Sequence, residues 1–463
     1  MSRDQSPRGI PMPSSINVPD RGRLVLPCKN RIDMEQFSCK FRCMDVGFDR
    51  FRALQARLPA DESRRLVVLT GARQTGKTTL AKRLYSELRY LNFDDLELRH
   101  FTRSIGASAW PEQVGPAILD EAQKEPGVFD KVKHAFDSGK LDFSLLLGSS
   151  RILLMDQVRE SLAGRAFVFD LWPLMPHELR SAWGERPART LFDRLLDQGE
   201  DALKVLSQAP GRLLPDEDHE LRSAWQHVHD WGGMPELLRL DENSRKEWLR
   251  SYLQTFLQRD LSDLARLADL EPFFQLQRLC MLRSGCLLSF ARLGRDAGVS
   301  ARTAKQYLEY LRMSYQVLLL PPYSRNLTSR TVKSPKLIWL DAGIRRQGTG
   351  QWGELAGEHF ESVVISEAWK WVSTAGLDIQ LSYYRTSSGL EVDLLAEGHA
   401  GVVAFEIKQR REPASKDLRG LRALAKALGQ EFRAGIVVYD GKEICRMDKD
   451  LPLFAVPAHR LFA

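Results

Sequence analysis

The chain has 463 residues, of which 43% are hydrophobic and 27% are charged, and its formal net charge is +7 at pH 7. This composition is typical of a globular protein, and no apolar run approaches the about 18 residues that a membrane helix needs, so we predict that it does not span a membrane. At roughly one domain per 150 residues, the length predicts about three domains. The small positive excess favours an anionic partner, although ordinary solvated surfaces carry such an excess as well.

The first 43 residues mix proline, serine, arginine and aspartate with little periodicity. Such a composition rarely buries enough surface to fold, so we predict a disordered extension over residues 1–43. The segment lacks the apolar core of a signal peptide, which predicts a cytoplasmic protein. The six cysteines include no C-x-x-C pair, and we expect reduced thiols rather than a zinc site.

Between residues 44 and 172, short apolar runs alternate with amphipathic stretches. The runs at 65–70, 117–120 and 143–148 have the length of buried strands, and residues 78–88 follow a helical pattern. This alternation predicts an α/β fold with a parallel sheet that is covered by helices on both faces.

Residues 71–78, Gly-Ala-Arg-Gln-Thr-Gly-Lys-Thr, match the pattern G-x-x-x-x-G-K-[ST] between a predicted strand and a predicted helix. The glycines let the backbone curl so that successive N–H groups point at phosphate oxygens. Lys77 is expected to reach the β and γ phosphates of ATP, and the Thr78 hydroxyl to bind Mg²⁺. We therefore predict a P-loop ATPase core over residues 44–172, whose nucleotide-binding residues are Gly71, Ala72, Arg73, Gln74, Thr75, Gly76, Lys77, Thr78 and Thr79.

Two carboxylates, Asp120 and Glu121, stand at the end of the predicted strand 117–120. Asp120 is expected to bind the nucleotide's Mg²⁺, and Glu121 to polarise the attacking water as a general base. Lys77 and Glu121 are the predicted catalytic residues at this site. Solvated loop charges are the alternative interpretation of the two carboxylates.

Polar residues also follow the next predicted strand. Ser149 or Ser150 could sense the γ-phosphate or orient the water, although a helix cap is an equally good interpretation. Arg165 could act as an arginine finger within the chain or across a subunit contact, and an ion pair at the surface is the alternative. An arginine finger that acts across a subunit contact requires a homo-oligomer, and the sequence leaves the oligomeric state open.

Residues 173–272 are rich in leucine, arginine, tryptophan and glutamate at helical spacing, which predicts a helical lid. Residues 273–345 contain two helical patterns that are joined at residues 298–300, where Ser300 is a predicted cap. This pattern predicts a winged-helix-like unit. Its basic residues could contact nucleic-acid phosphates, although a structural connector is the alternative; they are Arg292, Arg295, Arg302 and Lys305.

The segment from 346 to 463 predicts a separate α/β domain, because an amphipathic run at 357–371 precedes three strand-like runs. On two of these strands stand Asp393 and the pair Glu406 and Lys408. Asp393 and Glu406 would project the same way and hold a divalent metal, and Lys408 would orient or activate a water molecule.

This arrangement resembles that of PD-(D/E)XK nucleases. Glu361, on the preceding predicted helix, resembles the helical acidic residue of that restriction-endonuclease-like fold and could complete the metal shell. The pattern of one aspartate followed by Glu-x-Lys is weak alone, because it arises by chance in many chains.

Taken together, several motifs resemble those of bacterial and archaeal AAA-type P-loop ATPases that carry an appended domain of the DUF4143 type. The motifs are residues 70–79, 120–123, 148–150, 160–165 and 232–235, Arg259-Asp260 and the C-terminal carboxylates. The resemblance covers about residues 50–440. It implies ATP binding, ATP hydrolysis, a winged-helix middle and a nuclease-like C-terminal fold.

Two functions follow from these predictions. The first is an ATPase, with ATP and Mg²⁺ as ligands, that is coupled to a nuclease-like domain acting on DNA or RNA. The alternative is a nucleotide-dependent regulatory or interaction protein whose nuclease fold is catalytically silent.

Overall fold

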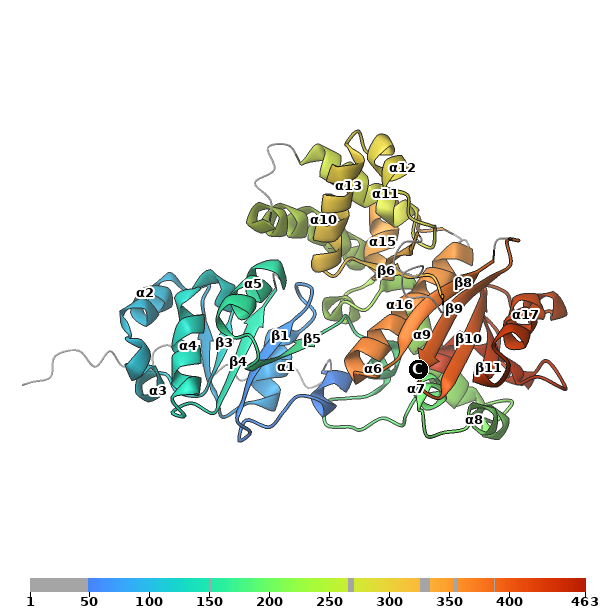
Figure 1. The fold of residues 1–463 in the computed structure, drawn as a ribbon, viewed down its shortest axis with the longest axis horizontal. Coiled ribbons are helices and arrows are strands. Elements are labelled where there is room, and N and C mark those ends of the chain that lie inside the picture. The colour runs from blue at the N-terminus through green and yellow to red at the C-terminus, as the bar shows by residue number, and fades with distance from the viewer. Residues whose placement is uncertain (1–48, 150, 265–269, 325–333, 354–356, 387) are drawn as a thin grey trace, which may run out of the picture. The chain divides into compact units, whose positions relative to one another are not determined.

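The computed structural model describes residues 49–149, 151–264, 270–324, 334–353, 357–386 and 388–463 (Figure 1). The predicted extension 1–43 and Ser150 lie outside the described residues, as do the side chains of Arg259 and Asp260. None of the described helices combines the length and the apolar character that a bilayer crossing demands.

A five-stranded sheet organises the first part of the chain, with the strand order β2-β3-β4-β1-β5. Its strands are β1 (Arg65–Thr70), β2 (Arg89–Asn92), β3 (Ala117–Asp120), β4 (Phe143–Gly148) and β5 (Ala166–Asp170). The helices around it are α1 (Lys77–Leu84), α2 (Leu96–Ser104), α3 (Trp110–Gln113), α4 (Gly127–Asp137) and α5 (Arg151–Ser161). All neighbouring strands pair in parallel, which confirms the predicted parallel sheet.

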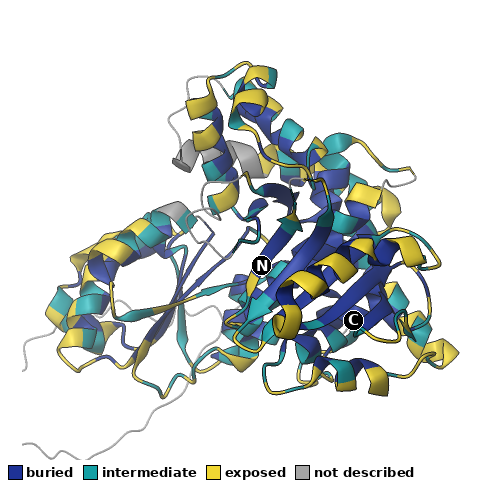
Figure 2. Ribbon diagram, turned by 45° about the vertical axis from the view of Figure 1, so that its right-hand side comes forward, coloured by how far each residue is buried: buried dark blue, intermediate teal, exposed yellow. Residues whose placement is uncertain are grey.

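The inner strands of this sheet, β3, β4 and β1, are buried on both faces. Along β1, Leu66 and Val68 belong to one hydrophobic core, whereas Val67 and Leu69 belong to another. The first core is completed by α2 to α5 and the second by α1. Figure 2 shows the inner strands as buried and the outer faces of the helices as exposed, whereas the edge strand β5 is intermediate or exposed. The near-continuous apolar runs of the sequence are therefore explained by helices on both sides.

The middle of the chain is mainly helical. Its elements are α6 (Pro176–Arg180), α7 (Leu191–Leu196), α8 (Ala202–Gln208), α9 (Pro215–Trp231), α10 (Glu242–Leu264), α11 (Glu271–Leu282), α12 (Phe290–Asp296), α13 (Ala301–Met313), β6 (Val317–Leu320), β7 (Lys336–Trp339) and α15 (Ala342–Thr349). The predicted cap is present, because the Ser300 hydroxyl accepts a hydrogen bond from the Thr303 amide at the start of α13.

Helices α11 to α13 are followed by an antiparallel ribbon of two strands, β6 and β7, and they share a core with it. An isolated bridge between Leu287 and Lys336 adds a short third pairing to this ribbon. The order of these elements agrees with the predicted winged-helix-like unit, and that assignment stays a prediction.

A separate mixed sheet forms the C-terminal domain, with the strand order β12-β13-β11-β10-β9-β8. Its elements are α16 (Gly357–Ala375), β8 (Gln380–Arg385), β9 (Glu391–Gly398), β10 (Gly401–Lys408), α17 (Arg419–Leu428), β11 (Phe432–Tyr439), β12 (Cys445–Arg446), β13 (Leu453–Pro457) and α18 (Ala458–Phe462). Strands β8 to β10 pair antiparallel, whereas β10, β11 and β13 run parallel. The predicted C-terminal α/β domain is therefore confirmed.

The first half of the predicted lid is part of the C-terminal domain's core. Phe192 of α7, Val205 of α8 and Trp225 of α9 share one hydrophobic core with α16 and the C-terminal sheet. Phe192, for example, lies 5.6 Å from Phe405 of β10 between ring centroids. The role of these helices as a lid stays a prediction, because helical periodicity reveals an apolar stripe but not the surface that covers it.

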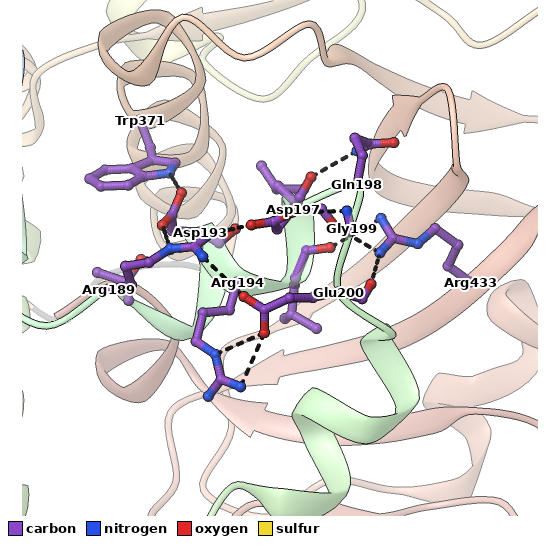
Figure 3. Close-up of polar contacts among 12 residues, drawn as sticks. Arg189, Asp193, Arg194, Asp197, Gln198, Gly199, Glu200, Trp371 and Arg433 are labelled. Carbon is purple, nitrogen blue, oxygen red and sulfur yellow. Dashed lines mark hydrogen bonds and ion pairs between the residues drawn. The ribbon is translucent and has the colours of Figure 1, made fainter. Parts of the chain in front are cut away.

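Polar contacts fasten the turn between α7 and α8 to the same domain (Figure 3). The Arg433 guanidinium donates hydrogen bonds to the backbone carbonyls of Leu195, Asp197 and Glu200, at 3.3, 2.9 and 2.6 Å. The Trp371 indole N–H donates to the Asp193 carboxylate at 3.3 Å. The turn is therefore held by side chains of both α16 and β11.

Replacing Arg433 by methionine should lower the thermal stability, since the backbone carbonyls lose their donor while most of the side-chain volume is kept. A loss of about 1–3 kcal/mol corresponds to a fall of a few degrees in the melting temperature. Arg411→Met, at an exposed position, is the control and should melt like the unmodified protein. Equal melting temperatures for the two variants would contradict the role of Arg433.

Candidate nucleotide site and a second carboxylate cluster

The loop between β1 and α1 has the backbone that the phosphate-binding motif requires. Gly71 and Gly76 adopt φ angles of +150° and +93°, which side chains disfavour. A Cβ atom on Gly71 would also lie 2.3 Å from the Leu171 carbonyl oxygen, so only glycine fits there. Helix α1 begins directly after Gly76, at Lys77. The loop and the positive end of the helix dipole thus form a site that suits an anion.

The predicted Mg²⁺ ligands lie in contact. The Thr78 hydroxyl donates a hydrogen bond to Asp120 Oδ2 at 2.7 Å, and the Tyr90 hydroxyl donates to the same oxygen at 2.8 Å. Burial and the charge of Asp120 raise the pKa of Tyr90 well above its usual value, so this phenol stays a donor. The Lys77 ammonium donates to the carbonyls of Gly71 and Ala72 at 3.0 and 2.8 Å.

Glu121, the predicted general base, is held in an uncommon conformation. Its φ angle is +50°, a region that non-glycine residues rarely occupy and that is concentrated at functional sites. The Ser149 hydroxyl lies 3.2 Å from both Glu121 carboxylate oxygens, and the Gln123 amide donates to Oε2 at 2.5 Å. Ser149 therefore contacts the predicted base. Gln123, two residues beyond Glu121, was given no role by the sequence.

Arg165 lies at the other edge of the sheet. It precedes β5, so it stands at the amino end of a strand that runs parallel to β1, whereas the phosphate loop follows the carboxyl end of β1. Its guanidinium pairs with Asp137 at 2.7 and 3.0 Å. The prediction of an arginine finger within the same chain is wrong, and the alternative ion pair is present.

A buried arginine that the sequence did not reveal supports the loop. Arg52 donates hydrogen bonds to the carbonyls of Thr75 and Trp172, at 2.8 and 2.5 Å, and its Nε lies 3.4 Å from the Glu178 carboxylate. It thereby ties the phosphate loop to the segment that follows β5. The partners lie 23 and 120 positions away, so no local pattern marks this residue.

A cavity of about 680 Å³ opens above the loop. This volume lies within the range of pockets that bind nucleotides and other small ligands. Its lining also includes Trp248 and Tyr252 of α10, which stack with centroids 5.2 Å apart, and Trp183, which packs under Arg83. The second half of the predicted lid therefore does line the candidate nucleotide site.

Tyr315, just after α13, reaches the base of the phosphate loop. Its hydroxyl lies 3.0 Å from Thr70 Oγ1 and 2.6 Å from Asp170 Oδ1, at the carboxyl ends of β1 and β5. Its ring meets Trp172 edge-on, with centroids 5.2 Å apart. Because Thr70 directly precedes Gly71, the middle region touches the nucleotide site through this residue.

A second cluster of charged side chains lies in the C-terminal domain. Lys408 Nζ lies 3.2 Å from Asp393 Oδ2 and 2.7 Å from Glu406 Oε1, so the structure brings these predicted residues together. The backbone amide of Ile407 also donates to Asp393 at 2.7 Å. Glu361 instead pairs with Lys336, at 2.9 Å, a lysine that the sequence did not single out.

The environment of these carboxyl groups disfavours their charged forms. Burial, followed by the charge of Asp393, raises the pKa of Glu361 and of Glu406 to about 7 each. Burial opposes the charge of Lys408, but Asp393 and Glu406 hold its pKa above the usual value. Among the residues that the structure describes, none donates to Glu406 Oε2, although this oxygen is buried.

The described part of the chain contains no group of three or more histidine, cysteine, aspartate or glutamate residues that is arranged to hold a metal ion. A metal role for Glu361, Asp393 and Glu406 therefore stays a prediction. The unpartnered oxygen of Glu406 fits such a role, because a buried carboxylate oxygen needs a donor or a cation.

Comparisons with known proteins divide the chain into three domains. Residues 63–180 match an AAA domain, residues 223–351 match a domain of unknown function, DUF8612, and residues 356–461 match a domain of unknown function, DUF4143. The predicted combination of an AAA-type ATPase domain with a DUF4143 domain is confirmed, whereas its nuclease-like nature stays a prediction. The predicted boundary at 272/273 falls inside the second matched domain.

Two curated relatives are uncharacterized proteins, Rv2008c of Mycobacterium tuberculosis and Mb2031c of Mycobacterium bovis. Each is 27% identical over 408 residues, which cover 86% of this chain and 80% of the relative. Among solved structures, the Walker-type ATPase PABY2304 of Pyrococcus abyssi is 16% identical with a TM-score of 0.36. The match covers 65% of this chain and 95% of the PABY2304 chain. The ORC2 protein of Aeropyrum pernix, in its ADP form, is 14% identical with a TM-score of 0.27. The match covers 65% of this chain and 92% of the ORC2 chain.

Replacing Tyr315 by phenylalanine should weaken ATP binding about fivefold, the factor that corresponds to one hydrogen bond of about 1 kcal/mol. Loss of the hydroxyl frees Thr70 beside the phosphate loop and removes a donor from Asp170. Titration with a fluorescent ATP analogue measures the effect. Tyr310→Phe, which removes an exposed hydroxyl of the preceding helix α13, is the control. Equal affinities would show that Tyr315 only fills space.

Proposed function

We propose that this chain, which carries an AAA domain and a DUF4143 domain, is a Mg²⁺-dependent ATPase coupled to a nuclease-like domain that acts on DNA or RNA. The ATPase part rests on the 2.7 Å hydrogen bond between Thr78 and Asp120, which joins two motifs that lie 42 positions apart. Thr78 and Asp120 would hold Mg²⁺, which neutralises phosphate charge when it is bound.

In this proposal each residue around the cavity has a separate role in hydrolysis. A water molecule attacks the γ-phosphorus, and the bond from that phosphorus to the β–γ bridging oxygen breaks, which gives ADP and inorganic phosphate. The Glu121 carboxylate takes the proton of the water. Ser149 and Gln123 fix the orientation of that carboxylate. Lys77 exchanges its loop carbonyls for phosphate oxygens and stabilises their charge.

Lys77→Ala should abolish ATP binding, whereas Glu121→Gln should keep binding and lower turnover by about a hundredfold or more, since only the proton acceptor is lost. Calorimetric titration with ATP and a phosphate-release assay separate the two effects. Lys140→Ala, at an exposed position, is the control and should behave like the unmodified protein. Hydrolysis at the unmodified rate in Glu121→Gln would overturn the assignment of the base.

The nuclease-like part of the proposal is supported by the C-terminal topology. Helix α16 precedes three antiparallel strands, and α17 then leads to β11, which runs parallel to β10. Asp393 and Glu406 stand on neighbouring strands of this sheet, and Lys408 follows on the second of them. This is the order that the resemblance to PD-(D/E)XK nucleases implies.

Asp393 and Glu406 would hold a divalent cation, which would neutralise the charge of the scissile phosphate when it is bound. Lys408 orients the water that attacks phosphorus, and its ammonium stabilises the charge that develops on the phosphate. The oxygen of the water bonds to phosphorus while the phosphorus–oxygen bond to one sugar breaks. The water loses one proton and the leaving sugar oxygen gains one, so a phosphate end and a hydroxyl end remain.

The basic side chains of α12 and α13 support nucleic acid as the substrate. All four predicted phosphate contacts are solvent-exposed; they are Arg292, Arg295, Arg302 and Lys305. Exposed arginine and lysine on a helix-turn-helix arrangement are the groups that contact phosphates. A cytoplasmic location and homo-oligomerisation stay predictions.

A second candidate function is a nucleotide-dependent interaction protein whose C-terminal domain is silent. The ion pairs of Lys408 favour it, because its ammonium already pairs with both carboxylates that would hold the cation. In such a protein the charged cluster would serve only as a buried ion-pair network.

Cleavage of labelled DNA and RNA in Mg²⁺ or Mn²⁺ buffer, with and without ATP, distinguishes the two functions. We expect Lys408→Ala to lower cleavage by about a hundredfold or more while ATP turnover persists, because the lost charge acts on the scissile phosphate. Lys426→Ala, at an exposed position of α17, is the matched control. If the unmodified protein hydrolyses ATP but cleaves neither substrate, the silent alternative holds.

A further inference from the structure

Lys336 is buried among carboxylates that belong to other elements. It opens β7 and is only 4% exposed. Its ammonium lies 2.9 Å from Glu361 Oε1 on α16 and 2.5 Å from Glu391 Oε1 on β9. A buried ammonium requires such partners, because burying an unpaired charge is costly.

These contacts bring Lys336 to the edge of the proposed cation site. Glu391 stands two residues before Asp393 on β9, and residues at this spacing share one face of a sheet. Asp393 is close enough for its charge to act on both Lys336 and Glu361. The cluster therefore joins four carboxylates to two lysines, Lys408 from within the domain and Lys336 from outside it.

Lys336 stands on the ribbon of β6 and β7, which lies outside the residues that match DUF4143. The Tyr383 backbone N–H donates to the Pro321 carbonyl at 3.0 Å, and the Tyr383 hydroxyl donates to the Ser334 carbonyl at 2.6 Å. The segments at both ends of the ribbon's connection are thus fastened to β8. Lys336 therefore belongs to the ribbon, whereas the carboxylates belong to the DUF4143 domain.

An independent observation points to a cation at this cluster. Glu406 is 9% exposed, and its Oε2 has no hydrogen-bond partner among the described residues. Lys408 occupies only the other oxygen, at 2.7 Å. A Cβ atom on Gly420 would lie 3.5 Å from Oε2, so the close approach of α17 leaves this oxygen buried. The cluster therefore has an oxygen that its two lysines do not satisfy.

We infer that Lys336 is a built-in counter-ion that competes with the divalent cation and positions Glu361 and Glu391 away from it. This inference rests on the proposed cation site at Asp393 and Glu406. While Lys336 stays in place, Glu361 is engaged and the cluster carries one more positive charge, so the cation binds weakly. Removal or withdrawal of the lysine frees Glu361 and strengthens binding.

Titration of the full-length protein with Mn²⁺ by calorimetry, without nucleotide, tests this inference. Lys336→Met should strengthen the binding about tenfold or more, because a positive charge close to the ligands is removed. Lys336→Arg keeps the charge and should bind like the unmodified protein. Asp393→Asn identifies the share of binding that belongs to the cluster, and Lys426→Met controls for the change in net charge.

The outcomes separate the inference from the proposed site. If binding that depends on Asp393 is unchanged in Lys336→Met, the inference fails while the cation site stands. If neither the unmodified protein nor Lys336→Met shows such binding, the proposed site fails and the inference falls with it. Thermal melting checks that each variant is folded, and Lys336→Gln, which keeps a polar contact, replaces the methionine variant if that one is unfolded.

Discussion

The hydrogen bond between Thr78 and Asp120 depends on the strand order of the first sheet. The two residues follow β1 and β3, and β4 lies between these strands. Because all the strands run parallel, their carboxyl ends meet at one edge of the sheet, and there the phosphate loop, the two carboxylates and Ser149 gather. The same constraint keeps Arg165, which stands at the amino end of β5, away from the nucleotide site of its own chain. One geometric rule thus decides which polar residues can reach the nucleotide.

The two candidate sites are joined by a shared core. Ala72 of the phosphate loop belongs to the same hydrophobic core as α16 and the C-terminal sheet, and Tyr315 belongs to it as well. Tyr315 is followed directly by β6, which pairs with the strand that carries Lys336. A short ribbon thus has one end at the base of the nucleotide site and the other at the carboxylate cluster. The proposed coupling between nucleotide and cation would have a physical route through these packed elements, and double-mutant cycles would measure its strength.

The sequence predicted those features whose evidence is local. The phosphate loop, the pair Asp120 and Glu121 and the strands that carry Asp393 and Glu406 are all recognisable within a few residues. By contrast, the roles of Arg52, Tyr315 and Lys336 come from partners on distant elements, and no spacing rule encodes such contacts. The surface that each helix of the predicted lid covers could not be predicted, for the same reason. An amphipathic helix requires an apolar neighbour. Helix α9 packs into the core of the C-terminal domain, whereas α10 lines the nucleotide cavity. A helical pattern does not specify the surface that the helix covers, so the sequence does not distinguish the two cases.

The carboxylate cluster sets a physical limit on the silent alternative. Ion pairs that serve structure alone can usually be replaced by apolar groups without loss of stability, and a buried oxygen without a donor costs about 1–3 kcal/mol. Glu406 carries such an oxygen, and Lys336 and Lys408 together cannot satisfy it. In the proposed cation site, a bound cation would satisfy this oxygen and displace the lysine counter-ion. The proposed cation site would therefore account for an oxygen that the silent alternative leaves without a partner among the described residues.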